Sequence, residues 1–400
     1  MNKFSLSALV AAGVLAGGFA TSASAADLGG NCCADLEERI AELEATTARK
    51  GNRKVSLTVS GWVSQQIMFW DDGFESNVYV SDIGTTLSSN VKFTGQATIA
   101  PGYSAGYVLH LESVSSDALL GINQDVDNGP GVLSGKANSV QAVQSYWFVK
   151  SDTLGKVSVG LQSHASDNTA ILVDGSGSLV PANYVAFDYG GFLHRNAAGA
   201  LTGRAYISDI ACMDCNGIPN NAIRYDSPTF AGFSLSASWG EDDFWDIAAR
   251  YSGEFNGIKV AVAAAYAEAT DQNGGAAKLQ PLMPEDSQYF QIGAYVQHVP
   301  TGLFLYGAYA TLDVDNASST ESDSFYVKAG IRQRWNSLGH TVLFGEYLDG
   351  NIDRNGSATT FSENSLWGLG VVQEVDAAAM SFWLTYRNAD VDVIGNTTIG

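Results

Sequence analysis

Alternating polar and apolar residues run in segments of about ten residues from residue 55 almost to the end of the chain. Leu57 and Val59 flank Thr58, and residues 233–239 alternate in the same way. A period of two is that of a β-strand, whose side chains point to its two faces in turn. Each segment is therefore predicted to be a strand with one apolar and one polar face. Such strands suit a half-buried sheet in water, or a barrel with a lipid-facing exterior and a hydrated interior.

Residues 1–25 have the pattern of a secretory signal peptide. Lys3 lies in the short basic region, residues 6–20 form the apolar core, and residues 23–25 read Ala-Ser-Ala, a small-residue cleavage site. The apolar core is shorter than the roughly 20 residues of a membrane-spanning helix, and no later stretch is apolar enough to span as one. We therefore expect an exported chain that can lie in a membrane only as a closed barrel, because lipid tolerates no unpaired backbone amides.

The strand pattern occurs fifteen times, with connections of two kinds. Connections after even-numbered strands are short and rich in turn residues, such as Asn256-Gly257, whereas those after odd-numbered strands are polar and usually longer. This asymmetry is typical of outer-membrane barrels, which have periplasmic turns and external loops, and a secreted β-sandwich would not need it. The expected strands are 54–69, 89–100, 104–115, 140–150, 156–164, 221–227, 232–240, 245–255, 258–268, 287–299, 303–314, 323–336, 340–348, 363–375 and 379–390.

A closed antiparallel barrel whose first strand starts in the periplasm needs an even number of strands. The fold is thus expected to be all-β, a transmembrane antiparallel β-barrel of 16 strands with a short N-terminal helix, although only fifteen strands are counted. Either the sequence stops inside the last loop, or the count is short by one within 165–220.

The chain divides into three parts: the signal peptide 1–25, a segment 26–53, and the barrel 54–400. Segment 26–53 is expected in the periplasm and contains a helical stretch over 34–50 with an apolar seam. A seam this short is marginal alone. It predicts either a local amphipathic helix or a small coiled coil that cooperates with an oligomer formed for other reasons.

Basic residues in several strands fall on the phase opposite to the apolar one. A basic side chain that faced lipid at the membrane midplane would cost roughly 2 to 4 kcal/mol, so these side chains are expected to face the interior. About sixteen strands leave a water channel, which predicts passive diffusion of small hydrophilic solutes and ions. The candidate pore-lining bases are Lys92, Arg224, Arg250, Lys328, Arg332 and Arg334.

The longest connection, residues 165–220, is expected to constrict this pore. It combines glycines with apolar anchors, which favours packing against the wall over exposure to solvent. Its acids Asp167, Asp174 and Asp188 could face the basic wall and set up a transverse field that sorts solutes by charge. The alternative is that they are ordinary solvated loop charges.

Charge and cysteine content exclude several other functions. A net charge of −21 argues against nucleic acid, and the acidic loops could hold divalent cations that bridge lipopolysaccharide of the outer membrane. Cys212 and Cys215 could form a small loop disulfide. A four-cysteine metal site would need all four in one place, whereas Cys32 and Cys33 lie in the head segment and the other two in the long loop. No metal or cofactor is expected.

Three long motifs, at 35–57, 145–157 and 225–239, resemble the general-diffusion porins of alphaproteobacteria. The resemblance covers nearly the whole mature chain and implies a sixteen-stranded barrel, a homotrimer, and a third loop folded into the pore. That loop corresponds to 165–220, and the basic pore wall to Arg224, Arg250, Arg332 and Arg334. Members of this family end on a strand with a terminal aromatic residue, whereas this sequence ends at Gly400.

Two other functions compete with a non-specific pore. One is a substrate-selective channel for sugars or anions, which a bound solute would block. The other is an outer-membrane enzyme, which would need a nucleophile beside a base. The five histidines are scattered singly and no Gly-x-Ser-x-Gly motif occurs, so we do not expect an enzyme.

Overall fold

The computed structural model describes residues 55–114, 118–119, 121–126, 139–212, 214, 217–240, 243–270, 286–315, 319–354 and 359–395. The expected signal peptide, the expected helix at 34–50, Cys215 and the end of the chain lie outside these residues. Within this part of the chain, no helix has the length and hydropathy needed to cross a membrane.

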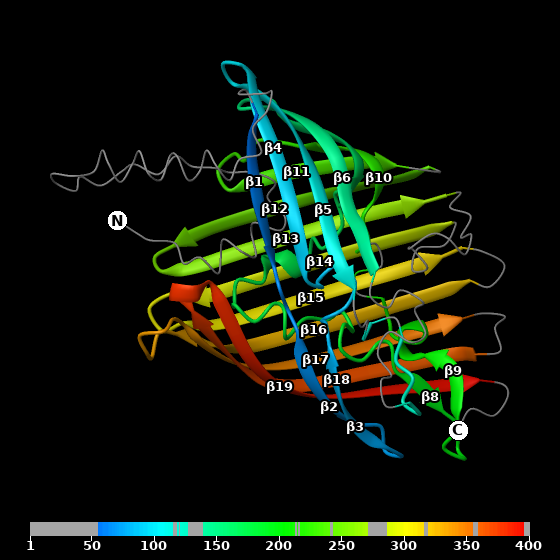
Figure 1. The fold of residues 1–400 in the computed structure, drawn as a ribbon. Helices are drawn as coiled ribbons and strands as arrows, with labels where there is room; N and C mark the ends of the chain where they lie inside the picture. Colours follow the sequence, from blue (N-terminus) through cyan, green and yellow to red (C-terminus); the bar gives the residue numbers. More distant parts are fainter. Residues whose placement is uncertain are drawn as a thin grey trace.

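Fifteen strands form one antiparallel sheet, in which each strand pairs with the next of the set (Figure 1). Each of the fifteen expected segments contributes a strand to this sheet, although the first does so only in part, and within the described residues β1 and β19 are the edges of the sheet. The strands are β1 (Ser56–Trp62), β4 (Asn90–Ala100), β5 (Tyr103–Val114), β6 (Ser139–Ser151), β7 (Gly155–Gln162), β10 (Asn220–Asp226), β11 (Phe233–Gly240), β12 (Phe244–Phe255), β13 (Ile258–Ala269), β14 (Ser287–His298), β15 (Leu303–Val314), β16 (Thr320–Gln333), β17 (Thr341–Arg354), β18 (Thr359–Val375) and β19 (Met380–Gly395).

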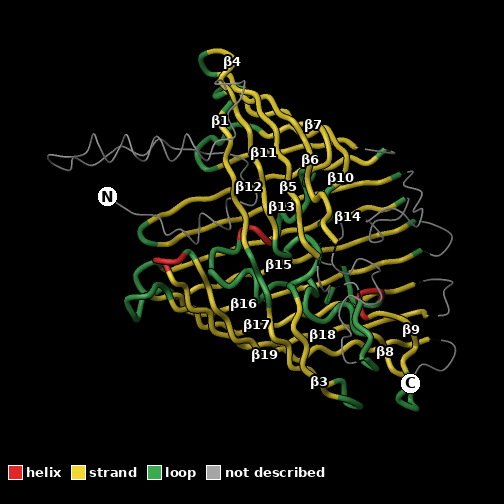
Figure 2. The backbone as a smooth tube through the Cα atoms, in the orientation of Figure 1, coloured by secondary structure: helices red, strands yellow, loops and turns green. Residues whose placement is uncertain are grey.

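The sheet curls round a central space. Figures 1 and 2 show β1 and β4–β6 on one side, crossing in front of β13–β19, with loop segments between the two walls. Short turns such as 256–257 join strands at one end, and the strands that precede the longer connections end at the other. The expected asymmetry of the two ends is thus confirmed.

Two regions differ from the expected strand pattern. The expected strand 54–69 breaks after Trp62, and β2 (Gln66–Asp71) pairs instead with β3 (Ser76–Ser81). A tight turn joins β2 and β3: Gly73 has φ +83°, and the carboxylate of Asp71 accepts a hydrogen bond from the Gly73 backbone N–H at 2.8 Å. The second difference is a small hairpin of β8 (Leu193–Arg195) and β9 (Leu201–Ala205) inside the long connection.

The two faces of the sheet differ as the alternation predicts. Large apolar side chains point outward, including Trp147 at 52% and Ile247 at 50% exposure. Charged side chains of the opposite phase, such as Asp246, are buried on the inner face. An apolar exterior over polar inner walls is the arrangement of a barrel in lipid.

Candidate pore and its loop

The connection between β7 and β10, residues 163–219, contacts the inner wall from β12 to β19. It contains the single turns η1 (Ile171–Val173) and η2 (Tyr206–Ser208) and the β8–β9 hairpin. Figure 2 shows it in green and red inside the curled sheet. The segment packs against the inner wall, and that it constricts a pore stays a prediction.

Asp246 on β12 holds the root of the loop. Its carboxylate accepts hydrogen bonds from the backbone N–H groups of Ala165, at 3.2 Å, and Ser166, at 2.7 Å, and lies 3.0 Å from His164 Nδ1. Because Asp246 is 1% exposed, these bonds fix the point at which the chain leaves β7 and enters the lumen.

Arg224 and Arg250, both expected in the pore wall, also anchor the root. Arg224 donates to the carbonyl oxygens of Ser163, at 2.8 Å, and His164, at 2.9 Å, and pairs with Asp226 at 2.7 Å. Arg250 donates to the carbonyl oxygen of Ala165 at 2.6 Å. The two guanidinium groups therefore position the loop as well as charging the wall.

The next part of the loop lies directly on β14. Gln291 accepts a hydrogen bond from the Ala170 N–H at 2.8 Å, and Tyr306 donates to the Ala170 carbonyl, also at 2.8 Å. A Cβ atom at Gly293 would lie 2.3 Å from that carbonyl oxygen. Glycine at this position thus permits the backbone of the loop to touch the wall.

Two of the three loop acids pair with basic groups of the wall behind the loop. Asp174 lies 2.6 Å from Lys328 on β16, and Asp188 lies 2.7 Å from Arg387 on β19. Arg387 also forms an ion pair with Glu346 at 2.8 Å. Arg387 was not among the pore-lining residues predicted from the sequence. It could have been found from the alternation, because it follows the outward-facing Tyr386 and therefore points to the inner face.

The third loop acid, Asp167, is buried at the root close to Asp214. The backbone N–H of Asn168 donates to Asp214 at 3.2 Å. Desolvation of this partly buried carboxyl, followed by the negative charge of Asp167, raises the pKa of Asp214 to about 8. Burial also raises the pKa of Asp167. A pair of acids in this state holds a proton at neutral pH.

The returning arm of the loop is fixed to β16–β18. Asn364 accepts a hydrogen bond from the Ala211 N–H at 2.8 Å, and Ser322 accepts one from the Cys212 N–H at 3.0 Å. Cys212 is disulfide-bonded. Because Cys215 lies outside the described residues, the pairing of Cys212 with Cys215 stays a prediction.

A cavity of about 2390 Å³ remains between the loop and the wall. Of the basic residues expected in the pore, Arg224, Arg250 and Arg332 line it, as do Lys150 and Lys156. The other three are placed differently. Lys328 is buried beneath the loop, Lys92 is half-buried on β4, and Arg334 lies beyond the end of β16, paired with Asp376.

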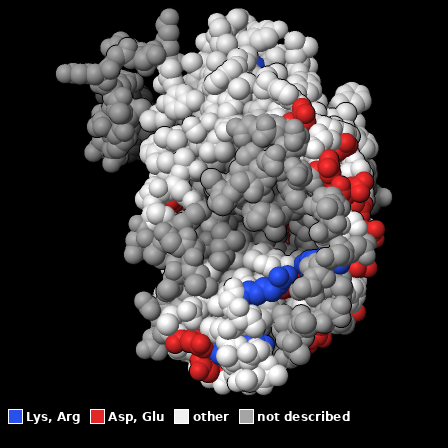
Figure 3. Space-filling model, turned by 90° about the vertical axis from the view of Figure 1, so that its right-hand side faces the viewer, with Lys and Arg blue, Asp and Glu red and all other residues white. Residues whose placement is uncertain are grey.

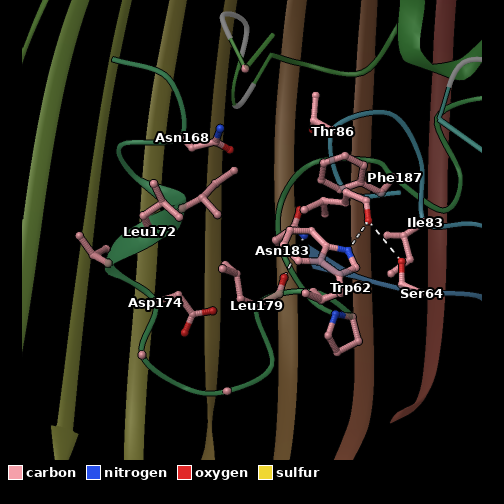
Figure 4. Close-up of a pocket in the computed structure, with 18 of the residues that line it drawn as sticks. Trp62, Ser64, Ile83, Thr86, Asn168, Leu172, Asp174, Leu179, Asn183 and Phe187 are labelled. Carbon is pink, nitrogen blue, oxygen red and sulfur yellow. Dashed lines mark hydrogen bonds between the residues drawn. The ribbon is translucent and has the colours of Figure 1, made fainter. Parts of the chain in front are cut away.

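The side of the loop that faces the cavity carries apolar as well as polar side chains. Figure 4 shows Leu172 and Leu179 there, with Trp62 from β1 beside Asn183 and Phe187. The Trp62 indole N–H donates to the Leu87 carbonyl at 3.1 Å, which fixes the ring. Aromatic and aliphatic side chains thus border the cavity on this side, and basic side chains border it on the wall.

Acidic side chains gather at the edge of the end that carries the longer connections. Figure 3 shows Asp and Glu gathered along one edge of this face, with a short basic stripe across it. One cluster joins three connections, because Arg195 pairs with Asp72 at 2.7 Å and with Asp125 at 3.0 Å. Such pairs cross-link the loops above the cavity.

Comparison with known proteins gives consistent results. The family described as Gram-negative porin matches residues 7–398. The chitoporin of Vibrio furnissii is 28% identical over 215 residues, which cover 45% of this chain and 58% of that relative, so the chain matches less than two thirds of the relative's length. Two solved structures of OmpT, an outer membrane protein of Vibrio cholerae, share the fold. The in-vitro folded protein has a TM-score of 0.52 at 12% identity and covers 88% of this chain and 96% of that chain, and its trimer form has a TM-score of 0.51 at 13% identity and covers 86% and 95%.

Proposed function

The chain belongs to the Gram-negative porin family, and we propose that it forms a water-filled outer-membrane channel for passive diffusion of small hydrophilic solutes and ions. The observation that carries this proposal is the loop 163–219, fixed across the inner wall of a curled fifteen-stranded sheet and bordering a cavity of about 2390 Å³. An apolar exterior places such a sheet in lipid, and the charged wall keeps the cavity hydrated.

The cavity wall supports a charge-sensitive diffusion pore. Several wall bases are already paired, as Lys156 with Asp226 at 3.1 Å and Arg332 with Glu374 at 2.9 Å. Paired charges leave a polar lining without a single strong trap, and weak binding is what permits ions and solutes to leave a pore as readily as they enter.

We further propose that the protein is a homotrimer of the alphaproteobacterial branch of the family. The motifs at 35–57, 145–157 and 225–239 support the branch. A trimer is consistent with the similar fold of OmpT, whose trimer form is among the solved structures. Chemical cross-linking of the detergent-purified protein tests the assembly, which should give a ladder that ends at three subunits.

A sugar-selective channel is the second candidate, because a partial relative is a chitoporin and because Trp62, Phe187 and Trp383 line the cavity. The flat face of an aromatic side chain packs against the apolar face of a sugar ring. Single-channel recording separates the two functions. Chito-oligosaccharides that block the current in a saturable way would favour the selective channel, and currents unaffected by these sugars would favour general diffusion.

A further inference from the structure

A row of charged side chains crosses the inner wall near the turns that follow β6 and β10. Lys150 on β6 lies directly opposite Lys156 on β7, and Lys156 lies directly opposite Asp226 on β10. Residues that are opposite each other in neighbouring antiparallel strands point to the same face, with Cβ atoms about 5 Å apart. All three residues line the cavity. The row therefore places two lysines and one aspartate side by side on the cavity wall.

Two arginines extend this row into a compact cluster. Arg224 pairs with one oxygen of the Asp226 carboxylate at 2.7 Å, and Lys156 pairs with the other at 3.1 Å. Ser236 donates to Asp226 Oδ1 at 2.9 Å, and Arg250 donates to Ser236 Oγ at 3.0 Å. Ion pairs, hydrogen bonds and strand register thus connect five charged residues that all line the cavity. We call them the basic cluster: Lys150, Lys156, Arg224, Arg250 and Asp226.

Positive charge exceeds negative charge in the basic cluster, because four cationic side chains surround one carboxylate. The other acids near the cavity do not cancel this excess. Asp174 and Asp188 pair with bases on β16 and β19, outside the cluster. Asp152 is exposed in the turn between β6 and β7, where solvent screens its charge. Asp167 lies at the root of the loop with only 2% of its surface exposed. This part of the wall therefore presents positive charge to the cavity.

Lys150 and Lys156 repel each other across their strand pair, since like charges directly opposite in a sheet are destabilising. An oxyanion between them would remove this repulsion and accept charge-assisted hydrogen bonds from both. A doubly negative group gains about twice the Coulomb attraction of a singly negative group with the same shape. Asp226 offsets part of that attraction, so the bound solute can still leave the channel.

We propose that the basic cluster is a subsite for small phosphate monoesters, whose phosphoryl group carries close to two negative charges just above neutral pH. The inference rests on the proposed channel function and names the solute class that the channel favours. The phosphoryl oxygens would contact Lys150 and Lys156 and approach the guanidinium groups of Arg224 and Arg250. The hydrophilic remainder of the solute would stay in the water of the cavity.

Methyl phosphate and methyl sulfate provide a matched test, because they have the same shape and differ by one negative charge once the second phosphate proton, with a pKa of about 6, is lost. Purified full-length protein in a planar bilayer carries a potassium chloride current at about pH 7.5, and either ester is added as its potassium salt. The measured quantity is the ester concentration that halves the open-channel current. Methyl phosphate should halve the current at a concentration about fivefold below that of methyl sulfate.

Lys156→Gln should raise the half-block concentration of methyl phosphate about fivefold and that of methyl sulfate less, because the loss of one positive charge weakens binding of the dianion more. Lys259→Gln is the matched control, since Lys259 is exposed on β13 beside the turn 256–257 and does not line the cavity. The control should keep both concentrations of the unchanged protein. Lys156→Arg, which keeps the charge, should also keep them, and this separates loss of charge from a change in wall structure.

The outcomes separate the two proposals. Absence of any current in potassium chloride would overturn the channel function and the subsite with it. A normal chloride current that methyl phosphate reduces no more than methyl sulfate does would overturn the subsite alone. Equal half-block concentrations of methyl phosphate in Lys156→Gln and Lys259→Gln would overturn it too.

Discussion

Lys328 Nζ and Asp174 Oδ2 form an ion pair of 2.6 Å in which neither side chain is exposed to solvent. Lys328 also donates to the carbonyl oxygen of Ala182 at 2.6 Å. One basic residue of β16 thus binds the loop at two points eight residues apart. A buried pair of this kind fixes geometry more than it adds stability, because desolvation of both charges offsets most of their attraction.

Replacing Lys328 by Met should release the middle of the loop. The change leaves Asp174 buried without its partner, and breaking a buried ion pair costs about 3 to 5 kcal/mol. We expect open-channel current noise to rise and the loop to become sensitive to added protease. In the double variant Lys328→Met with Asp174→Leu, current noise should fall most of the way back to that of the unchanged protein, because Asp174 then leaves no unpaired charge in the buried site. Current noise in Lys328→Met equal to that of the unchanged protein would show that this ion pair does not hold the loop in place.

Gly293→Val should lift the loop from β14. A Cβ at Gly293 would lie 2.3 Å from the Ala170 carbonyl oxygen, whereas a Cβ at Gly307 on the neighbouring β15 has no atom closer than 3.7 Å. Gly307→Val is therefore the matched control. Single-channel conductance should change in Gly293→Val and remain near the original value in Gly307→Val. Equal effects of the two changes would show that the close contact of the loop with β14 does not control the pore.

The loop root should weaken as the pH rises. Asp214 has an ordinary pKa of 3.8 that desolvation and the charge of Asp167 raise to about 8. Between these values the folded loop keeps a proton that the unfolded chain has released, so the free energy of unfolding falls with rising pH and levels off above about pH 8. The other charged groups around the root are His164, Asp246, Arg224 and Arg250.

Current noise recorded from pH 6 to pH 9 measures this effect, and it should rise up to about pH 8 and level off above that pH. Asp214→Asn removes the titrating group and should give a flat profile over the same range. A profile that is unchanged by this substitution would assign the pH dependence to another group.

Arg250→Gln should shift ion selectivity toward cations. The change removes a wall charge that has neutral oxygens as its partners, among them Ala165 O and Thr169 Oγ1. Arg250→Lys is the control that keeps the charge. Reversal potentials under a potassium chloride gradient should move in Arg250→Gln and stay in Arg250→Lys. Identical reversal potentials in the two variants would exclude Arg250 from the selectivity of the pore.

Most of the fold could be predicted from the sequence, because a period of two is a strong local signal. The fifteen strands of the sheet and the phase that places Ile247 outside and Lys328 inside follow from alternation alone. The β2–β3 hairpin was missed because its second strand, Ser76–Ser81, lies between the expected strands 54–69 and 89–100, where the sequence predicts a connection.

The candidate site was predicted less completely, because it depends on contacts across the lumen. Sequence patterns placed Arg224 and Arg250 on the inner wall but could not show that they bind the root of the loop. They also identified Asp174 and Asp188 as loop acids without showing that each turns toward the wall behind it. The direction of a loop side chain is set by tertiary packing, which has no period in the sequence.

Single-channel conductance of the detergent-purified protein in a planar bilayer tests most directly whether this protein forms a channel. A salt gradient across the bilayer gives the ion preference in the same recording. We predict stable current steps that close in threes. A folded, membrane-inserted protein that gives no current steps would contradict the account.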